Sequence, residues 1–307
     1  MKRPFGKTAA GTTVTVGTFD GVHRAHRAVL EALVARAAAT GRDALVVSFD
    51  RHPLEVVRPE MAPPILTTMP ERRAAIAETG VGRARFLRFD AAMAALSPED
   101  FVRRILIGEC EMKALVLGDD HALGRGRTGD VGVLRQLGEA LGFEVEVVAP
   151  VEVEGIRVSS TRIRSAIEAC DLRTAAQLLG RPYSVEGRVE LGEQRGRRLG
   201  IPTLNLGGFN PRKLLPPDGV YAVRAEWRGG QAEGMMNQGP KPTFADQRRT
   251  LEAHLFGVEM DLYGEWVRLE WVERLRDVRR FNSAEELTRQ LADDRQQAIA
   301  ALARSAR

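Results

Sequence analysis

The spacing of apolar residues changes once along this chain of 307 residues, and the change limits the possible folds more than any other feature. Up to about Leu179, short apolar runs alternate with segments whose apolar residues recur at helical spacing, which indicates strands alternating with amphipathic helices. After Tyr183, strand-like runs follow one another through turns rich in Gly and Pro. We therefore predict two domains, residues 1–181 and 182–307.

The alternation in the first half is typical of a parallel, doubly wound, Rossmann-like α/β sheet. The expected strands are Thr12–Val16, Ala44–Phe49, Arg83–Phe89, Ala114–Gly118 and Phe143–Val148. The expected helices are Arg27–Thr40, Pro70–Thr79, Pro98–Glu109 and Val131–Leu141. Ser97 stands before Pro98 and is followed by a carboxylate at Asp100, which is a sequence signature of a helix start.

The second half predicts an antiparallel β-barrel or sandwich followed by one helix. The expected strands are Ser184–Leu191, Val220–Trp227, Gln231–Asn237, Thr250–Phe256 and Trp266–Leu275. Ser283 and Glu286 have the spacing of a capping box. The final helix is therefore expected to begin near Ser283 and to continue to about Ala303.

Composition excludes several function classes. The chain has 45 Lys and Arg against 41 Asp and Glu, and no run of five basic residues, so we expect no nucleic-acid partner. No apolar stretch is long enough to span a membrane, and no apolar run follows residues 1–7. Cys110 and Cys170 are isolated and lack metal-ligand spacing. We expect both to be reduced thiols in a cytoplasmic protein.

His23 and His26 form the first candidate site. They follow an expected strand and a glycine turn, and they stand at the start of an expected helix. Their spacing places both imidazoles on one face of the first helical turn, beside backbone N–H groups that attract anions. Such a pair can stabilise the charge that develops on a phosphate during nucleotidyl transfer. The alternative is that both are surface histidines without a function.

Two further segments of the first half contain sequence patterns that can bind phosphate. Ser160 or Thr161 at a helix start, together with Arg164, can bind a phosphate, although the hydroxyl can equally be a simple helix cap. Gly124–Gly129 matches G-x-G-x-x-G, but it does not directly follow a strand. We therefore do not expect a dinucleotide-binding loop there.

The second half contains a loop rich in Arg and Gly that runs into Pro202-Thr203-Leu204-Asn205. The loop can cradle phosphates, and Thr203 and Asn205 share one face if the segment is extended. Their oxygens are the hard ligands that Mg²⁺ prefers. Glu252 lies in an apolar strand, where a single glutamate is most often only a surface residue.

Several of these segments resemble the FMN adenylyltransferase half of the bifunctional bacterial FAD synthetases (riboflavin kinase/FMN adenylyltransferase). The matching segments are Gly17–Leu30, Ser48–Pro53, Leu66–Thr68, Gly118–Asp130 and Val158–Arg164. The resemblance implies a nucleotidyltransferase site for ATP and FMN, with His23 and His26 as catalytic residues. It also implies binding roles for Gly17, Phe19, Asp20, Asp50, His52, Pro53, Asp120, Ser159, Ser160, Thr161 and Arg164.

The first half departs from the family pattern at two places. The family's His-x-Gly-His is His23-Arg24-Ala25-His26 here, which puts a methyl group where close backbone approach is expected. The family's Gly-x-Asp-Phe-x-Phe-Gly is Gly118–Gly124, with His121 and Leu123 at the two phenylalanine positions. The resemblance places this segment near the flavin, so aromatic surface is lost there. One alternative is therefore a riboflavin kinase whose adenylyltransferase domain is inactive or weakened.

The second half resembles the riboflavin kinase module of the same enzymes, a small Greek-key barrel with a terminal helix. The matching segments are Leu179–Tyr183, Gly187–Gly192, Arg195–Leu206, Gly219–Ala222, Asn237–Phe244, Leu251–Phe256 and Leu262–Gly264. The resemblance implies that Glu252 is the general base for the riboflavin 5′-hydroxyl and that Thr203 and Asn205 bind Mg²⁺. It implies binding roles for Gly192, Arg195, Gly196, Gly200, Thr203, Asn205 and Arg276.

We therefore predict a cytoplasmic bifunctional enzyme that phosphorylates riboflavin to FMN and adenylylates FMN to FAD, with Mg²⁺ and ATP in both steps. The expected partners are the small molecules riboflavin, FMN and ATP, with no nucleic acid and no membrane. A non-catalytic flavin-binding regulator is a third possibility, which the joint presence of Glu252, Thr203 and Asn205 disfavours. The sequence does not indicate an oligomeric state.

Overall fold

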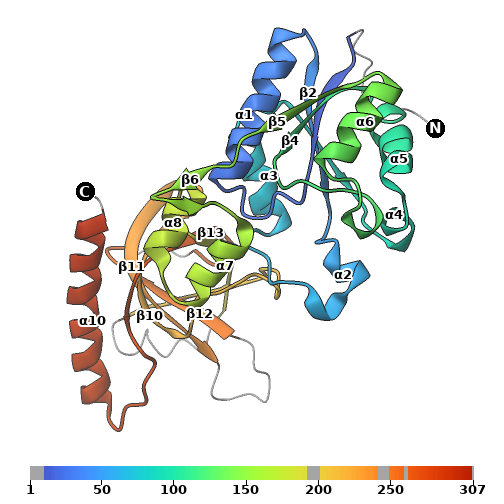
Figure 1. The fold of residues 1–307 in the computed structure, drawn as a ribbon. Helices are drawn as coiled ribbons and strands as arrows, with labels where there is room; N and C mark the ends of the chain where they lie inside the picture. Colours follow the sequence, from blue (N-terminus) through green and yellow to red (C-terminus); the bar gives the residue numbers. More distant parts are fainter. Residues whose placement is uncertain (1–9, 192–200, 241–248, 259–261, 306–307) are drawn as a thin grey trace. The chain divides into compact units, whose positions relative to one another are not determined.

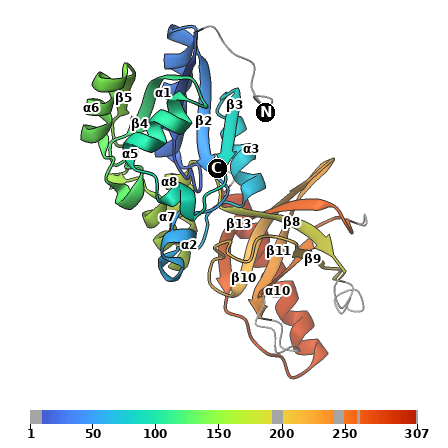
Figure 2. The ribbon, with the colours of Figure 1, turned by 90° about the vertical axis from the view of Figure 1, so that its right-hand side faces the viewer.

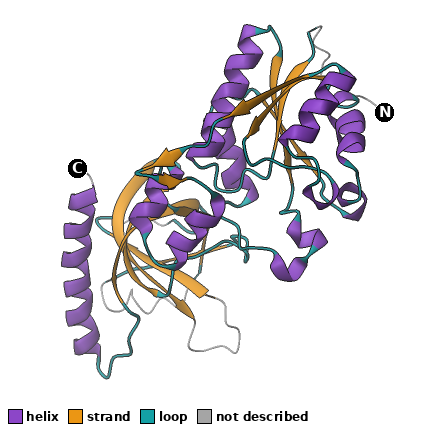
Figure 3. Ribbon diagram, in the orientation of Figure 1, coloured by secondary structure: helices purple, strands orange, loops and turns teal. Residues whose placement is uncertain are grey.

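The computed structural model describes residues 10–191, 201–240, 249–258 and 262–305. The chain divides into two compact units, Met1–Ser160 and Thr161–Arg307. Helices and strands alternate through the first unit, whereas strands dominate the second (Figure 3). The predicted fold class, an α/β sheet domain followed by a β-barrel and a terminal helix, is confirmed.

The first unit contains a parallel five-stranded sheet in the order β3-β2-β1-β4-β5 (Figure 1). Its strands are β1 Thr12–Val16, β2 Asp43–Phe49, β3 Arg83–Leu87, β4 Met112–Gly118 and β5 Glu144–Val148. The chain moves outward from β1 to β3 and then returns to add β4 on the other side of β1. The order of the strands therefore reverses between β1 and β4, which is where doubly wound sheets bind ligands.

Helices cover both faces of this sheet (Figure 2). The helical segments are α1 Arg24–Ala39, α2 Leu54–Val57, η1 Pro59–Met61, α3 Met69–Ala77, α4 Ala91–Ala94, α5 Pro98–Asp100, η2 Phe101–Ile107, η3 Arg125–Arg127 and α6 Val131–Leu141. Leu30 and Leu33 of α1 pack with Val46 of β2 on one face. Val47, the next residue of β2, packs on the other face in the cluster that includes Leu134 of α6. Because strand side chains alternate, both faces of the sheet are apolar.

Two details of the first unit refine the sequence analysis. The predicted helix Pro98–Glu109 begins with Ser97 as its cap, but from Phe101 to Ile107 it is wound as a π-helix. The Gly124–Gly129 segment is a loop closed by paired backbone hydrogen bonds between Leu123 and Gly129. Its one helical turn, η3, does not open off a strand, in contrast to the loop of a dinucleotide-binding motif.

The second unit contains a closed six-stranded barrel in the order β10-β11-β12-β9-β8-β13. Its strands are β8 Ser184–Glu190, β9 Leu204–Gly207, β10 Gly219–Trp227, β11 Gly230–Pro240, β12 Arg249–Leu255 and β13 Trp266–Arg276. All its pairs are antiparallel, and closure leaves no free sheet edge. β9 was not among the predicted strands, because four residues give too short an alternating pattern to recognise.

The remaining elements are three helices, α7 Ser160–Glu168, α8 Leu172–Leu179 and α10 Ala284–Ser305. A short hairpin precedes α7 and consists of β6 Glu152–Val153 and β7 Ile156–Arg157. Helix α8 ends at Gly180, which adopts the left-handed conformation that glycine favours. Ala298, Ala301 and Leu302 of α10 pack against Ala222 and Met235 of the barrel. The barrel unit includes α8 and the part of α7 from Thr161 on. The change in apolar spacing, from which the boundary at residues 181/182 was predicted, comes only after these two helices.

Within the described part of the chain, no helix is long and apolar enough to cross a membrane. Cys110 is buried and Cys170 is half-buried, and both are free thiols.

Candidate functional sites

Several predicted residues of the first unit come from loops that follow β1, β2 and β4. Gly17 follows β1, Asp50 follows β2, and Asp120 follows β4 by two residues. Because the carboxyl ends of parallel strands lie at one edge of a sheet, these three loops share that edge. The edge also contains the reversal of strand order between β1 and β4, so the structure brings this part of the prediction together.

His23 and His26 lie against each other at the start of α1. Their rings are stacked with centroids 3.6 Å apart, and the ring of Phe19 meets His26 edge-on at 5.1 Å. His23 is buried and caps α1, because its Nδ1 accepts a hydrogen bond from the His26 backbone N–H at 3.3 Å. Nδ1 therefore carries the lone pair, which leaves Nε2 to carry the proton of the neutral ring. The reading of these residues as unconnected surface histidines does not fit this geometry.

Asp20 is buried in a network that fastens the loop between β1 and α1 to another segment. Its carboxylate accepts hydrogen bonds from the backbone N–H groups of Leu66 and Thr67 and from the Thr67 hydroxyl, at 2.9–3.1 Å. The Thr67 hydroxyl also accepts from Gly21 N–H at 2.9 Å, and the Ser160 hydroxyl donates to the Asp20 carbonyl at 3.1 Å. These contacts give Asp20 and Ser160 a role in shaping the loop.

Asp50, His52 and Asp120 also make local contacts. The Asp50 carboxylate accepts from the Phe89 N–H at 2.9 Å, which ties the loop after β2 to the loop after β3. His52 Nδ1 accepts from the Leu54 N–H at 3.2 Å beside Pro53, which precedes α2. Asp120 is exposed, and its carboxylate lies 4.0 Å from the Arg157 guanidinium.

His121 stands in the segment after β4 that departs from the family pattern. Burial, aided by the positive charge of Arg127, lowers the pKa of His121 from 6.5 to about 4. At neutral pH the ring is therefore uncharged, and it offers a flat neutral surface at a position where the family pattern has an aromatic residue. Its Nε2 is buried without a hydrogen-bond partner among the described residues.

The remaining predicted residues of this group are divided by the unit boundary. Ser159 and Ser160 end the first unit, whereas Thr161 and Arg164 lie on the part of α7 that belongs to the second. Four residues of the predicted kinase loop, Gly192, Arg195, Gly196 and Gly200, lie outside the described residues.

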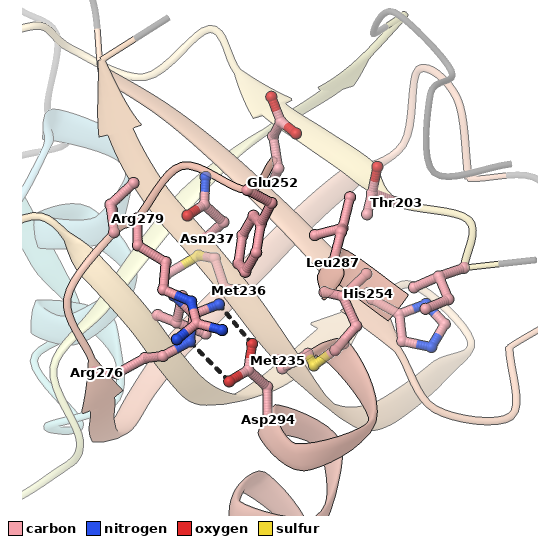
Figure 4. A pocket seen from close by; sticks show the side chains of 15 residues that line it. Thr203, Met235, Met236, Asn237, Glu252, His254, Arg276, Arg279, Leu287 and Asp294 are labelled. Carbon is pink, nitrogen blue, oxygen red and sulfur yellow. Dashed lines mark hydrogen bonds and ion pairs between the residues drawn. The ribbon is translucent and has the colours of Figure 1, made fainter. Parts of the chain in front are cut away.

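The second site is built on three neighbouring strands of the barrel. Glu252 on β12 pairs with Asn205 on β9 and with Asn237 on β11. Residues directly opposite one another across a sheet point to the same face, so these three side chains form one row. Thr203 precedes Asn205 by two residues and lies on the same side of the cavity as Glu252 in Figure 4.

Glu252 and Asn237 of this row line a cavity of ≈ 280 Å³. The lining residues are Ile201, Thr203, Val220, Met235, Met236, Asn237, Glu252, His254, Arg276, Val278, Arg279, Phe281, Leu287, Leu291 and Asp294. The polar groups Glu252, Asn237 and Thr203 lie along one side, and most other walls are apolar (Figure 4). An apolar cavity with a few convergent polar groups is typical of a site for a small molecule with a large ring.

Arg276 is fixed at the cavity wall by a buried partner on α10. Its Nε and Nη2 donate to the two oxygens of Asp294 at 2.8 and 2.7 Å (Figure 4). Gln290 donates to the same carboxylate at 2.7 Å. Only 1% of the Asp294 side chain and 19% of the Arg276 side chain are exposed. The pair joins β13 to α10 and holds the cavity between them.

His254 is one of several lining residues that were not predicted as site residues. Its Nδ1 lies 2.8 Å from the Pro202 carbonyl, and because a carbonyl only accepts, Nδ1 carries the proton. The bond fixes the chain directly before Thr203. Asn237 and Asp294 were also missed. The cross-strand register identifies Asn237, but the sequence alone does not contain that register.

The donors present suit Mg²⁺, although no cluster of three or more His, Cys, Asp or Glu residues that could hold a metal occurs among the described residues. Mg²⁺ is commonly bound through one or two protein oxygens together with phosphate oxygens and water. The Thr203 hydroxyl, the Asn205 amide oxygen and the Glu252 carboxylate supply such oxygens along one row. The donor set therefore fits a metal that arrives with a nucleotide.

Comparisons with known proteins match both units. A family model described as FAD synthetase matches residues 6–162, and one described as riboflavin kinase matches residues 179–302. The bifunctional riboflavin kinase/FMN adenylyltransferase of Escherichia coli strain K12 is 38% identical over 285 residues, which cover 92% of this chain and 90% of that protein. The Pseudomonas fluorescens protein of the same description is 40% identical over 278 residues, with 90% and 88% covered.

The Bacillus subtilis protein of that description is 33% identical over 297 residues, which cover 94% of this chain and 92% of that protein. A crystal structure described as a macrolide-efflux protein from Streptococcus pneumoniae aligns with a TM-score of 0.84 at 30% identity. The alignment covers 94% of both chains, so the two share the same fold from the first unit to the second.

Proposed function

Because the chain belongs to the bifunctional riboflavin kinase/FMN adenylyltransferase family, we propose that the cavity beside Glu252 is its kinase site and that the His23–His26 loop is its adenylyltransferase site. The protein phosphorylates riboflavin to FMN and adenylylates FMN to FAD, and both reactions use ATP. The predicted family and pair of activities are thereby confirmed. The relatives named above span both units, which favours two active sites over the two alternatives with fewer.

At the kinase site, the observation that carries the proposal is the row formed by Asn205, Glu252 and Asn237, of which Glu252 and Asn237 line the polar side of the cavity. The apolar walls receive the flavin ring, and the ribityl chain extends toward Glu252. Glu252 accepts the proton of the 5′-hydroxyl as the oxygen attacks the terminal phosphate of ATP and ADP leaves. Thr203 and Asn205 would hold Mg²⁺, which would neutralise charge on the phosphates. The predicted phosphate loop, Arg195–Gly200, precedes them in the chain.

Glu252→Gln tests this assignment, because it keeps the size of the side chain and removes the base. We expect FMN formation from riboflavin to fall by about 10² to 10⁴. Conversion of supplied FMN to FAD should be unchanged. Glu226→Gln, an exposed strand glutamate of the same barrel, is the matched control. Phosphorylation of riboflavin by Glu252→Gln at the wild-type rate would rule out the assigned role.

At the adenylyltransferase site, the stacked pair of histidines carries the proposal. His23 has its Nδ1 lone pair engaged by a backbone N–H, so Nε2 can donate a hydrogen bond to a phosphate oxygen. The two stacked rings lie 3.6 Å apart, so a donor on one ring is held beside the other. The pair can therefore place hydrogen-bond donors beside the ATP α-phosphate, where negative charge develops as the FMN phosphate attacks and pyrophosphate leaves.

His23→Ala and His26→Ala test the second assignment. Each should slow FAD formation from FMN by about 10² to 10³, since one positioned donor is lost. The rate of FMN formation from riboflavin should remain normal in both and serves as the internal control. Wild-type FAD formation in both variants would show that the histidines do not act on the phosphate.

We further propose Mg²⁺ as the metal in both reactions, cytoplasmic location, and a division of the two catalytic modules at residues 181/182. The separate family models, which end at residue 162 and begin again at residue 179, support a division in this region. Removal of divalent metal with EDTA should stop both reactions, and added Mg²⁺ should restore them. Persistence of either reaction in EDTA would argue against a metal at that site.

A further inference from the structure

The loop between β1 and α1 has a strained backbone. Phe19, Gly21 and Val22 all have positive φ angles, of 49°, 86° and 39°. Glycine adopts such angles readily, but a phenylalanine and especially a β-branched valine do not. Backbone of this kind persists only where the surrounding structure determines it, and it is frequent at active sites. Something beyond the loop itself must therefore hold this conformation.

Arg72 is placed to do so. It lies on α3, and only 6% of the residue is exposed. Its Nη1 donates to the carbonyl of Thr18 and its Nη2 to the carbonyl of Phe49, each at 2.7 Å. Thr18 lies in the loop after β1, and Phe49 ends β2. One guanidinium thus joins the two loops at the edge of the sheet where the candidate site lies.

The residues that lead into α3 make a second set of contacts with the loop between β1 and α1. Leu66 and Thr67 bind the Asp20 carboxylate, as described above, and Thr68 and Glu71 form a reciprocal capping box at the helix start. The capping box fixes the position of the first turn of α3 relative to Thr67. Arg72 follows directly, so the contacts to Thr18 and to Asp20 come from one rigid segment.

Burying the charged guanidinium of Arg72 costs free energy of desolvation. Desolvation lowers the pKa of Arg72, and the charges of Asp20 and Asp50 only partly offset it. Its Nε is buried and has no hydrogen-bond partner within the described residues. Apolar side chains of similar size often serve stability as well as buried charges do. Stability alone therefore gives little reason for an arginine here, whereas control of two carbonyls requires its two-pronged geometry.

We propose that Arg72 is a positioning residue for adenylyl transfer, which holds the Gly17–His23 loop in the conformation that stacks His23 on His26. The inference rests on the proposed assignment of these histidines. Arg72 acts through Thr18: when that carbonyl is fixed, Phe19 stays against His26 and His23 stays at the cap of α1. Loss of the guanidinium lets the loop relax toward ordinary backbone angles and moves both rings.

The test compares Arg72→Lys and Arg72→Met with Arg73→Met, a neighbouring and exposed arginine of the same helix, all in the full-length chain. For each, kcat and KM are measured for FAD formation from FMN and ATP. FMN formation from riboflavin is measured in the same preparations, and thermal unfolding checks the fold. Amide hydrogen exchange over residues 17–26 reports the loop directly.

We expect Arg72→Met to lower kcat by about 10²-fold, since a misplacement of about 1 Å can cost that much, while KM for both substrates changes little. Arg72→Lys should recover part of the rate, because an ammonium can serve one of the two carbonyls, and should remain about tenfold slow. Amides of the loop should exchange faster in both variants. Arg73→Met should match the wild type.

Arg72→Lys decides the matter if Arg72→Met does not fold. Wild-type kcat in Arg72→Lys, an equal loss in Arg73→Met, or a rise in KM at constant kcat would each overturn the inference. His26→Ala, measured beside them, separates the two levels of the account. If His26→Ala forms FAD at the full rate, the assignment of the adenylyltransferase site is wrong. If His26→Ala loses FAD formation but Arg72→Lys forms FAD at the wild-type rate, only the role of Arg72 is wrong.

Discussion

Asp294→Asn perturbs the ion pair between β13 and α10 and provides a sharp test of how the kinase cavity is held. In the wild-type protein, the Asp294 carboxylate accepts two hydrogen bonds from Arg276 and one from Gln290. Asparagine has the same shape but no charge, and its NH2 group must face one of these donors. The substitution therefore removes the attraction and adds a clash between donors without opening a cavity.

The expected cost follows from the burial of the two partners. Removing one partner of a buried ion pair typically costs about 3–5 kcal/mol. Here Asp294 is 1% exposed, but Arg276 keeps 19% of its side chain in contact with solvent, so the charge left behind is partly hydrated. We therefore expect a cost at or just below the lower end of this range, about 2–3 kcal/mol. For a unit of this size, that corresponds to a fall of about 4–12 °C in its unfolding temperature.

The assay combines calorimetry with separate measurements of the two reactions. Asp294→Asn should lower the transition of the barrel unit and raise KM for riboflavin, because Arg276 loses its fixed place at the cavity wall, while FAD formation from FMN is preserved. Asp293→Asn, the exposed neighbour on α10, is the control and should match the wild type. Unchanged stability and unchanged KM in Asp294→Asn would refute the reasoning about this pair.

Two further predictions concern His121 and the independence of the barrel unit. Because the pKa of His121 is lowered to about 4, its ring should show no NMR titration between pH 5 and 8. The unfolded chain binds the extra proton below pH 6.5, so this ring's contribution to stability is lost as pH falls from 6.5 toward 4. A midpoint near 6.5 in the native protein would contradict the burial of the ring. A fragment Thr161–Arg307 should unfold cooperatively and convert riboflavin to FMN without making FAD. The reason is that it is a compact unit with its own core and contains Thr203, Asn205 and Glu252. A folded fragment that makes no FMN would show that the kinase needs the first unit.

The sequence predicted those features that depend on local spacing. The bounds of β1 and α6 agree with the structure at both ends, because each is an apolar segment bounded by clear turn or capping residues. The helix expected over Arg27–Thr40 is observed as α1, Arg24–Ala39, with Val29, Leu30 and Leu33 buried at helical spacing. The family pattern identified the two segments that contain the candidate catalytic residues, the start of α1 and strand β12. Periodicity and motifs are local, and these features are local too.

The features that were missed depend on contacts between distant segments. Nothing near Arg72 in the sequence shows that it reaches the carbonyls of Thr18 and Phe49. Asn237 joins the row beside Glu252 only through the register of β11 and β12. Asp294 looks like any other acid of a charged helix until α10 is packed on the barrel. Such partners become visible only when strand pairing and helix packing are known.

The most direct test of the central claim, two independent active sites on one chain, is complementation between two inactivated variants. Glu252→Gln and His26→Ala are incubated separately and then together with riboflavin, ATP and Mg²⁺, and flavins are separated by chromatography. We expect almost no product from Glu252→Gln alone, FMN as the main product of His26→Ala alone, and FAD from the mixture, because FMN released by one variant is adenylylated by the other. Failure of the mixture to make FAD, or failure of His26→Ala alone to make FMN, would contradict the claim.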